Sequence, residues 1–186
     1  PAAWNAILPA QPASPPLDGA VKVDVAIVGG GFAGLSAARR LRQHDQNLRI
    51  AVLEASGLAE GASGRNSGFM IDLPHDIQSD DYAGKGVEAD KEMIALNRAA
   101  ISFAKDCVEE YEIDPVYFDP VGKINGAVTD AARRLNVSYA AHLAQLDEKS
   151  EELDARSMHE ITGSRYYTSG LYTPGTVMLQ PAGYVR

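Results

Sequence analysis

The stretch Val28-Gly29-Gly30-Gly31-Phe32-Ala33-Gly34 decides the fold of this 186-residue chain. Three of its glycines have the spacing Gly-x-Gly-x-x-Gly. The β-branched segment 21–28 leads into it, as expected of a buried parallel strand, and the Ala- and Leu-rich segment 35–41 follows, as expected of a helix. Glycines in such a unit permit a tight turn, a close approach to a diphosphate, and close packing of the helix on the strand. The stretch therefore predicts a dinucleotide-binding turn.

A second strand is predicted at residues 49–54, and it ends in the acid Glu54. An acid about 20 residues beyond the last glycine accepts hydrogen bonds from a ribose in this type of fold. Because a carboxylate would repel a 2′-phosphate, Glu54 favours FAD or NAD over NADP. The alternative is an ordinary strand–helix–strand unit with a solvated glutamate.

Residues 56–69 contain four glycines and three serines, a composition that does not suit regular secondary structure. The exposed N–H groups, the hydroxyls and the guanidinium of Arg65 could bind a second part of a long anionic cofactor. A flexible surface loop is the alternative interpretation.

Together these segments resemble the D-amino-acid oxidase superfamily of FAD-dependent oxidoreductases, in the branch of γ-glutamylputrescine oxidoreductase and sarcosine-oxidase-like enzymes. The specific part is Gly61-Ala62-Ser63-Gly64-Arg65-Asn66-Ser67-Gly68, which NAD dehydrogenases have no reason to carry. The resemblance implies an α/β fold, in which a Rossmann-type FAD-binding domain is followed by the start of an α+β substrate domain. It also implies non-covalent FAD, because some relatives link the flavin through a residue at one of these positions, whereas this chain has Arg65 and Asn66 there and no His, Cys or Tyr.

The resemblance further implies which residues bind the cofactor. The diphosphate would be lined by Gly29, Gly31, Phe32, Ala33 and Gly34 and covered by Gly61, Ala62 and Ser63. Glu54 would hold the ribose, with Ala55 beside it. The flavin would be approached by Arg65, Asn66, Ser67 and Gly68.

The activity implied by the resemblance is oxidation of the C–N bond of an amine or amino acid to an imine, with oxygen as acceptor and hydrogen peroxide as product. Arg65 and Asn66 are the candidates for tuning the flavin ring; binding phosphate or holding the loop is their alternative role. Two other functions stay open: an NAD-dependent dehydrogenase, and a non-catalytic nucleotide-binding subunit or redox sensor. No metal site is expected.

The sequence predicts an extended N-terminal arm at 1–18, a FAD-binding portion at 19–85, and a helical insert with the start of the substrate domain at 86–186. Tyr117–Ile124 resembles the family's hairpin leading into that domain, and Leu179–Val185 resembles the return toward the flavin. Only two strands of the Rossmann sheet are found, so the fold is expected to be incomplete without a second polypeptide that carries the remaining half. A proteolytic fragment, a partial gene product and a natural subunit all fit this expectation.

Helices are predicted at 88–112, 130–150 and 154–162 from their periodicity. In the first, an apolar stripe should bury Met93, Leu96, Ala100, Ala104, Cys107 and Tyr111. Strands are predicted at 166–172 and 176–179, where they either line a substrate cavity or form sheet surface.

Composition restricts the remaining possibilities. Cys107 is the only cysteine, which excludes an intrachain disulfide and a zinc–thiolate cluster and fits the cytoplasm. From Ile71 onward, eleven lysines and arginines face twenty acids, a balance that opposes nucleic acid and anionic membranes and modestly attracts cationic amines. Solubility is the simpler explanation of that charge. Among the histidines, His75 follows the glycine-rich loop closely enough to be considered near the cofactor.

Overall fold

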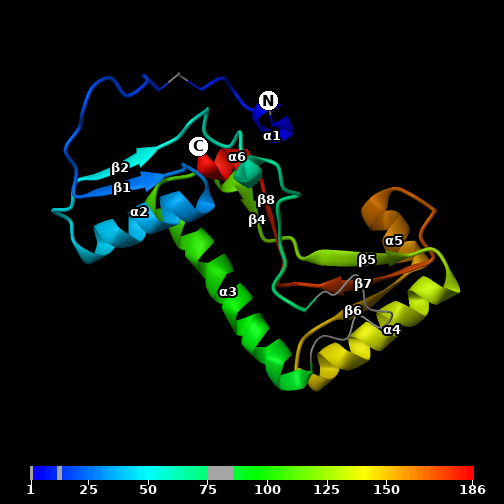
Figure 1. Cartoon of the computed structure of the whole chain (residues 1–186). Helices are drawn as coiled ribbons and strands as arrows, with labels where there is room; N and C mark the ends of the chain where they lie inside the picture. Colours follow the sequence, from blue (N-terminus) through cyan, green and yellow to red (C-terminus); the bar gives the residue numbers. More distant parts are fainter. Residues whose placement is uncertain (1, 12–13, 75–85) are drawn as a thin grey trace. The chain divides into compact units, whose positions relative to one another are not determined.

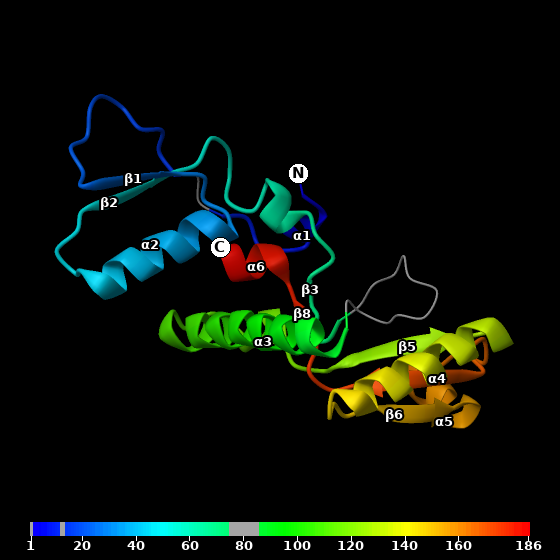
Figure 2. The same cartoon turned by 60° about the horizontal axis from the view of Figure 1, so that its bottom comes forward.

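The computed structural model describes residues 2–11, 14–74 and 86–186, so His75 lies outside the described residues. The chain forms two compact units. The first contains Pro1–Gly68, Ile113–Tyr117 and Gln180–Arg186, and the second contains Phe69–Glu112 and Phe118–Leu179. Figure 1 labels the α-helices and most of the strands of both, and Figure 2 labels β3. The domain limits expected from the sequence stay predictions.

The first unit contains the predicted strand–helix–strand motif. Strand β1 (Val25–Val28), helix α2 (Phe32–His44) and strand β2 (Ile50–Leu53) follow one another, and the two strands pair in parallel, with Val28 opposite Leu53. An ion pair of 2.8 Å between Asp24 and Arg49 joins the two strands at the point where they begin. Hydrogen bonds from Arg49 lower the pKa of Asp24 to about 2. The predicted parallel strand pair, with a helix between its two strands in the sequence, is thus present as a local unit.

This motif has little core of its own. No residue of β1, α2 or β2 is buried, and the Val28 side chain at the end of β1 is 87% exposed. Within the described residues, the sheet holds only these two strands. The two faces of a parallel sheet are normally both covered by helices, which explains apolar strands. Here the strands are apolar although no residue in them is buried.

The remaining elements of the first unit come from distant parts of the chain. They are the helix α1 (Ala3–Ala6), the 3-10 turns η1 (Ala62–Gly64) and η2 (Pro115–Tyr117), and the helix α6 (Pro181–Val185). Helix α1 lies within the segment for which an extended arm is expected. It contacts η1 and α6, and these contacts explain why four residues are helical, since so short a helix is not stable alone.

The second unit contains two antiparallel sheets. Their strand orders are β3 (Phe69–Met70), β8 (Val177–Leu179), β4 (Phe118–Asp119) in one, and β5 (Lys123–Ala127), β7 (Ser169–Thr173), β6 (Glu151–Asp154) in the other. Because β4 and β5 belong to different sheets, the expectation of a hairpin at Tyr117–Ile124 is wrong. Between these strands the chain turns at Gly122, whose φ is +77°.

Three helices accompany these sheets: α3 (Val87–Glu110), α4 (Asp130–Gln145) and α5 (Ala155–Thr162). Helix α4 is shorter than the predicted 130–150, because the chain turns after Gln145 and then forms the edge strand β6. The side chains of Thr129 and Asp154 cap α4 and α5 by accepting hydrogen bonds from N–H groups in their first turns. No helix of the described part is both long and apolar enough to cross a membrane.

The apolar stripe predicted for α3 is only partly correct. Ala104 and Cys107 are buried, whereas Met93, Leu96 and Tyr111 are about half exposed or more. The buried positions nearer the start of the helix are Asp90 and Ile94. Asp90 can be buried there because its carboxylate lies 2.8 Å from Nε2 of His142 on α4. A polar pair between two helices therefore replaces an apolar contact that the sequence pattern favours.

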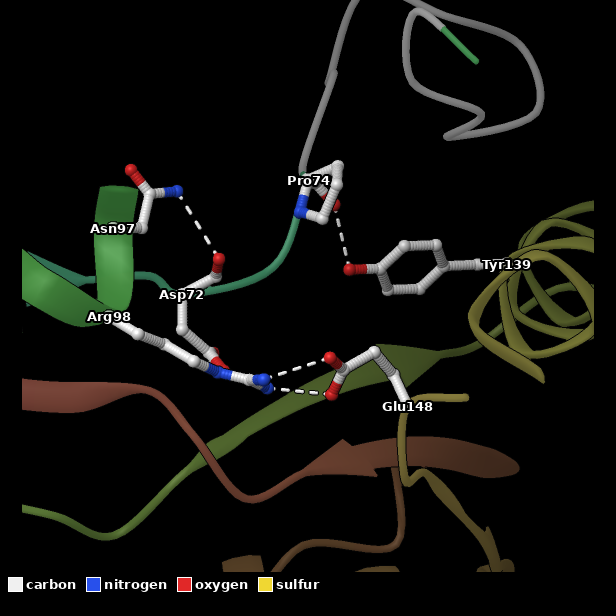
Figure 3. Close-up of polar contacts among 6 residues, drawn as sticks. All are labelled: Asp72, Pro74, Asn97, Arg98, Tyr139 and Glu148. Carbon is white, nitrogen blue, oxygen red and sulfur yellow. Dashed lines mark hydrogen bonds and ion pairs between the residues drawn. The ribbon is translucent and has the colours of Figure 1, made fainter. Parts of the chain in front are cut away.

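An apolar core and an ionic network stabilise the second unit. The core consists of Leu73, Ile94, Tyr139, Leu143, Leu146 and Leu171. The network is centred on Arg98, which binds the buried carboxylate of Asp72 at 3.0 Å and Glu148 at 2.6 Å (Figure 3). Asn97 donates to the backbone carbonyl of Asp72, and the hydroxyl of Tyr139 donates to that of Pro74. These bonds attach segment 72–74 to α3 and α4.

Candidate cofactor site

The glycine turn joins β1 to α2 and leaves no room for a larger side chain at Gly34. A Cβ atom on Gly34 would lie 1.9 Å from the carbonyl oxygen of Gly29, which is far closer than any real contact. Gly29 itself has a φ of +103°, in the region that favours glycine. The third glycine of the pattern thus allows helix and turn to pack closely, as predicted.

The start of α2 faces the loop that contains residues 61–68. Gly31 caps the helix without a side-chain hydrogen bond, and the N–H of Phe32 donates to Oγ of Ser63 at 3.0 Å. A Cβ atom on Gly31 would lie 2.6 Å from the same Oγ. The structure therefore brings together the two segments that the sequence predicts to bind the diphosphate. N–H groups at a helix start, next to a hydroxyl, suit an anionic diphosphate.

Glu54 follows β2 and turns toward the glycine stretch. One carboxylate oxygen accepts the N–H of Gly30 at 2.8 Å, and the other accepts the N–H of Ser56 at 3.1 Å. These bonds, that of Gly30 foremost, hold the pKa of Glu54 below its usual value, so the carboxylate is charged at neutral pH. A charged acid at this point can accept hydroxyl hydrogen bonds and would repel a further phosphate. Ala55 is exposed beside it.

Asn66 holds the predicted flavin-facing end of the loop together. Its side-chain amide donates to the carbonyl of Ser63 at 2.8 Å, and its side-chain oxygen accepts the N–H of Gly68 at 2.8 Å. Both ends of the side chain are therefore bound within the loop. Ser67 is exposed between them. This arrangement favours the alternative in which Asn66 shapes the loop.

Arg65 is also bound close to its own position in the chain. Its Nε donates to the carbonyl of Glu60 at 2.6 Å, and its Nη2 lies 3.6 Å from the Glu60 carboxylate. The guanidinium is about half exposed, so it stays accessible to solvent. Of the two roles that the sequence left open for Arg65, holding the loop is the one that these contacts support.

Sequence reasoning missed the contacts that the N-terminal segment makes with this loop. Trp4 donates from its indole nitrogen to the carbonyl of Asn66 at 2.7 Å, and Asn5 donates to Leu58 and Glu60. These partners lie more than fifty positions away in the sequence. No local pattern could have revealed them, although a lone tryptophan in a Pro-rich segment is an unusual residue to leave in solvent.

The second unit has a hollow of about 510 Å³, and one of its lining residues comes directly after the 61–68 loop in the sequence. It is lined mainly by Phe69, Ile71, Val121, Ile124 and Ile161. Phe69 directly follows Gly68. The strands β7 and β8, for which the sequence left two roles open, are largely buried and so are not simply exposed sheet surface.

Comparison with known proteins agrees with this geometry. The family model described as FAD dependent oxidoreductase (DAO) matches residues 24–186. γ-Glutamylputrescine oxidoreductase of Escherichia coli K12 is 27% identical over 169 residues, which cover 83% of this chain and 36% of that protein. Probable oxidoreductase OrdL of Rhizobium meliloti is 40% identical over 65 residues, covering 35% of this chain and 15% of its own length.

Solved structures show the same fold. Glycine oxidase from Geobacillus kaustophilus superposes with a TM-score of 0.66 at 20% identity, covering 88% of this chain and 42% of that chain. L-α-Glycerophosphate oxidase from Mycoplasma pneumoniae, a structure with FAD bound, gives a TM-score of 0.55 at 18% identity, covering 88% and 40%. This chain thus spans less than half the length of each of these relatives.

Proposed function

Because the chain belongs to the family of FAD dependent oxidoreductases, we propose that it forms the FAD-binding part of an enzyme that oxidises the C–N bond of an amine or amino acid. FAD is the cofactor, so the alternative function of an NAD-dependent dehydrogenase is no longer supported. When bound, FAD supplies a two-electron acceptor. The amine loses two electrons and two protons to become an imine, and oxygen takes up the same number to become hydrogen peroxide.

The main support for FAD binding is the contact between Phe32 at the start of α2 and Ser63 of the 61–68 loop. It places N–H groups, a hydroxyl and the Glu54 carboxylate around one glycine turn. In this proposal, residues 29–34 and 61–63 bind the diphosphate, Glu54 holds the ribose, and residues 65–68 approach the flavin. The chain's own contribution is thus placement of the cofactor and exclusion of water, with the binding non-covalent.

The support for an amine substrate comes from the relatives. The name of the Escherichia coli relative specifies γ-glutamylputrescine, and the Geobacillus structure is a glycine oxidase. The glycerophosphate oxidase shows that the same fold also accompanies a different substrate class. A substrate panel must therefore contain both classes.

The proposal includes a second polypeptide that carries the rest of the enzyme. Its support is the exposed motif of β1, α2 and β2, which has no buried residue although its strands are strongly apolar. Further parallel strands beside β1 or β2 would bury side chains such as Val28. We place the assembly in the cytoplasm, in keeping with a single, buried cysteine.

The experiment purifies the chain with any polypeptide that accompanies it and adds candidate substrates without oxygen. Loss of the visible flavin band with glycine, sarcosine or γ-glutamylputrescine supports amine oxidation, and peroxide formed on admitting air supports oxygen as the acceptor. If only glycerol 3-phosphate bleached the flavin band, the substrate would be an alcohol and the proposal of an amine substrate would be wrong. A yellow assembly that no substrate bleaches would favour a non-catalytic FAD-binding subunit. Intact mass of the same sample identifies or excludes the second polypeptide.

A further inference from the structure

We propose that the segment 2–8 is a positioning element for FAD, because it holds the loop at residues 58–66 in the conformation that meets the glycine turn. We call this segment the N-terminal clamp. The inference concerns the FAD site alone and does not depend on the substrate being an amine. It assigns Trp4, Asn5 and Glu60 a role that their sequence positions do not suggest.

The first step is the set of hydrogen bonds between the clamp and the loop. The indole N–H of Trp4 donates to the carbonyl of Asn66 at 2.7 Å. The side-chain amide of Asn5 donates to the carbonyl of Leu58 at 3.1 Å and to Oε1 of Glu60 at 2.8 Å. The clamp therefore holds the loop at its beginning, its middle and its end.

Glu60 joins the clamp to the rest of the loop. Its Oε2 accepts the backbone N–H of Ala2 at 2.8 Å and lies 3.6 Å from the guanidinium of Arg65. Arg65 donates in turn to the backbone carbonyl of Glu60. Hydrogen bonds to a charged carboxylate are stronger than those between neutral groups, so Glu60 is the strongest single connection.

Helix α6 supports the clamp from another side. Gln180, which caps α6, donates to the backbone carbonyl of Trp4 at 3.3 Å. Ala59, Ala182 and Val185 form a buried cluster, and Trp4, Leu8 and Phe32 are among the apolar side chains packed against it. Figures 1 and 2 both show α1 beside α6 in the first unit. The loop is thus enclosed between two elements from opposite ends of the sequence.

The loop needs such support because its backbone is locally unfavourable. Ala59 has a φ of +59°, a conformation that residues other than glycine rarely adopt, and it is buried. A Cβ atom on Gly64 would lie 1.8 Å from the carbonyl oxygen of Ala59, so the turn closes tightly on itself. Strained backbone of this kind persists only where surrounding contacts hold it.

The held loop presents Ser63 to the cofactor site. Ser63 lies in η1, next to α1 and α6, and its Oγ accepts the N–H of Phe32. If the clamp is released, η1 can move and Ser63 no longer lies at the start of α2. FAD would then have to order the loop as it binds, and its affinity would fall.

The test compares three variants in the full chain, together with any accompanying polypeptide. Trp4→Phe keeps an aromatic ring in the cluster and removes the N–H donor, Asn5→Ala removes two hydrogen bonds, and Asn5→Gln retains an amide donor. The matched control is Asn47→Ala, an exposed asparagine outside the site. Flavin fluorescence gives the dissociation constant of FAD, and hydrogen exchange in the cofactor-free chain gives the protection of residues 58–66.

We expect Trp4→Phe to raise the dissociation constant about fivefold, which is the fold-change for one lost hydrogen bond, and Asn5→Ala to raise it about tenfold or more, because two are lost. Exchange at 58–66 should become faster in both variants, Asn5→Gln should restore part of the affinity, and Asn47→Ala should change neither quantity. Unchanged exchange would overturn the clamp itself. Faster exchange with an unchanged dissociation constant would overturn its role in positioning FAD.

Discussion

The strand–helix–strand motif of the first unit has far fewer buried contacts of its own than the second unit. The motif of β1, α2 and β2 has no buried residue, whereas the second unit has a six-residue apolar core and a buried carboxylate paired with Arg98. The first unit holds the residues that the sequence predicts to bind the cofactor, and it is the part whose sequence is easier to interpret. The difference indicates that the binding motif depends on groups other than its own side chains: FAD, the N-terminal clamp, and the proposed second polypeptide.

The largest effect is expected from Arg98→Ala, which removes the central side chain of the ionic network in the second unit. The change leaves the Asp72 carboxylate buried without its charged partner, and removal of one partner from a buried pair costs about 3–5 kcal/mol. We expect a value near the lower end, because the Arg98 side chain is half exposed. Denaturant unfolding of the second unit measures it. The control is Arg156→Ala, whose exposed pair with Glu160 should contribute about 0.5 kcal/mol or less. Equal losses in the two variants would contradict the network.

Gly34→Ala should disable the first unit without affecting the second. The added methyl group would meet the carbonyl oxygen of Gly29, so α2 must move away from the turn that is predicted to bind the diphosphate. We expect the dissociation constant of FAD to rise by about a hundredfold or more, or about 2.7 kcal/mol. Gly57→Ala is the control, because its added methyl would make only an ordinary contact with Glu60. Measurement is by flavin fluorescence, with the exchange protection of β7 unchanged in both variants.

Comparing the chain with and without FAD tests the difference between the two units without any substitution. A ligand present at a hundred times its dissociation constant stabilises the state that binds it by about 2.7 kcal/mol. We expect slower hydrogen exchange in β1, β2 and the 61–68 loop when FAD is added, and little change around Tyr139 and Leu143 in the core of the second unit. Uniform protection of both units would show that they unfold together, and the contrast between them would then be wrong.

Sequence patterns predict the parts of the molecule whose structure depends on residues close together in the sequence. The glycine turn, both strands beside it and the acid at Glu54 follow from spacing and from steric demands within a few residues. Segment 151–154, Glu-Glu-Leu-Asp, lacks β-branched residues and forms β6 only by pairing with β7. Met93 and Leu96 fit a helical stripe but are exposed, while Asp90 is buried because His142 lies opposite. These outcomes depend on partners that periodicity does not contain.

For the site, the sequence identified the two segments that meet but not what holds them. Ser63 and Phe32 were both named from the resemblance, and they make a direct contact. For Trp4 and Asn5 the sequence predicts only an extended arm, since nothing near them in the sequence indicates contact with a loop more than fifty residues away. The roles of individual residues toward the cofactor stay predictions.

The smallest effect expected is a pH dependence confined to the first unit. Hydrogen bonds hold the pKa values of Glu54 and Glu60 below their ordinary value of 4.5 in the folded chain. Their contribution to stability is therefore fully present above pH 4.5 and is lost as the pH falls through the lower folded values. We expect the protection factors at Gly30 and in the 58–66 loop, taken relative to the intrinsic exchange rate at each pH, to fall over this interval. The Glu54 carboxylate is exposed and that of Glu60 is partly exposed, so the change should be modest and should shrink in high salt.

Glu54→Gln tests which carboxylate is responsible, because glutamine keeps an oxygen that can accept the Gly30 N–H and does not titrate. The variant should flatten the acid response at Gly30 and leave that of the 58–66 loop, which depends on Glu60, unchanged. The paired change Glu60→Gln should do the reverse. If Glu54→Gln flattened both responses, the glycine turn and the clamped loop would be one cooperative element, and the N-terminal clamp would then stabilise the whole FAD site and not the loop alone.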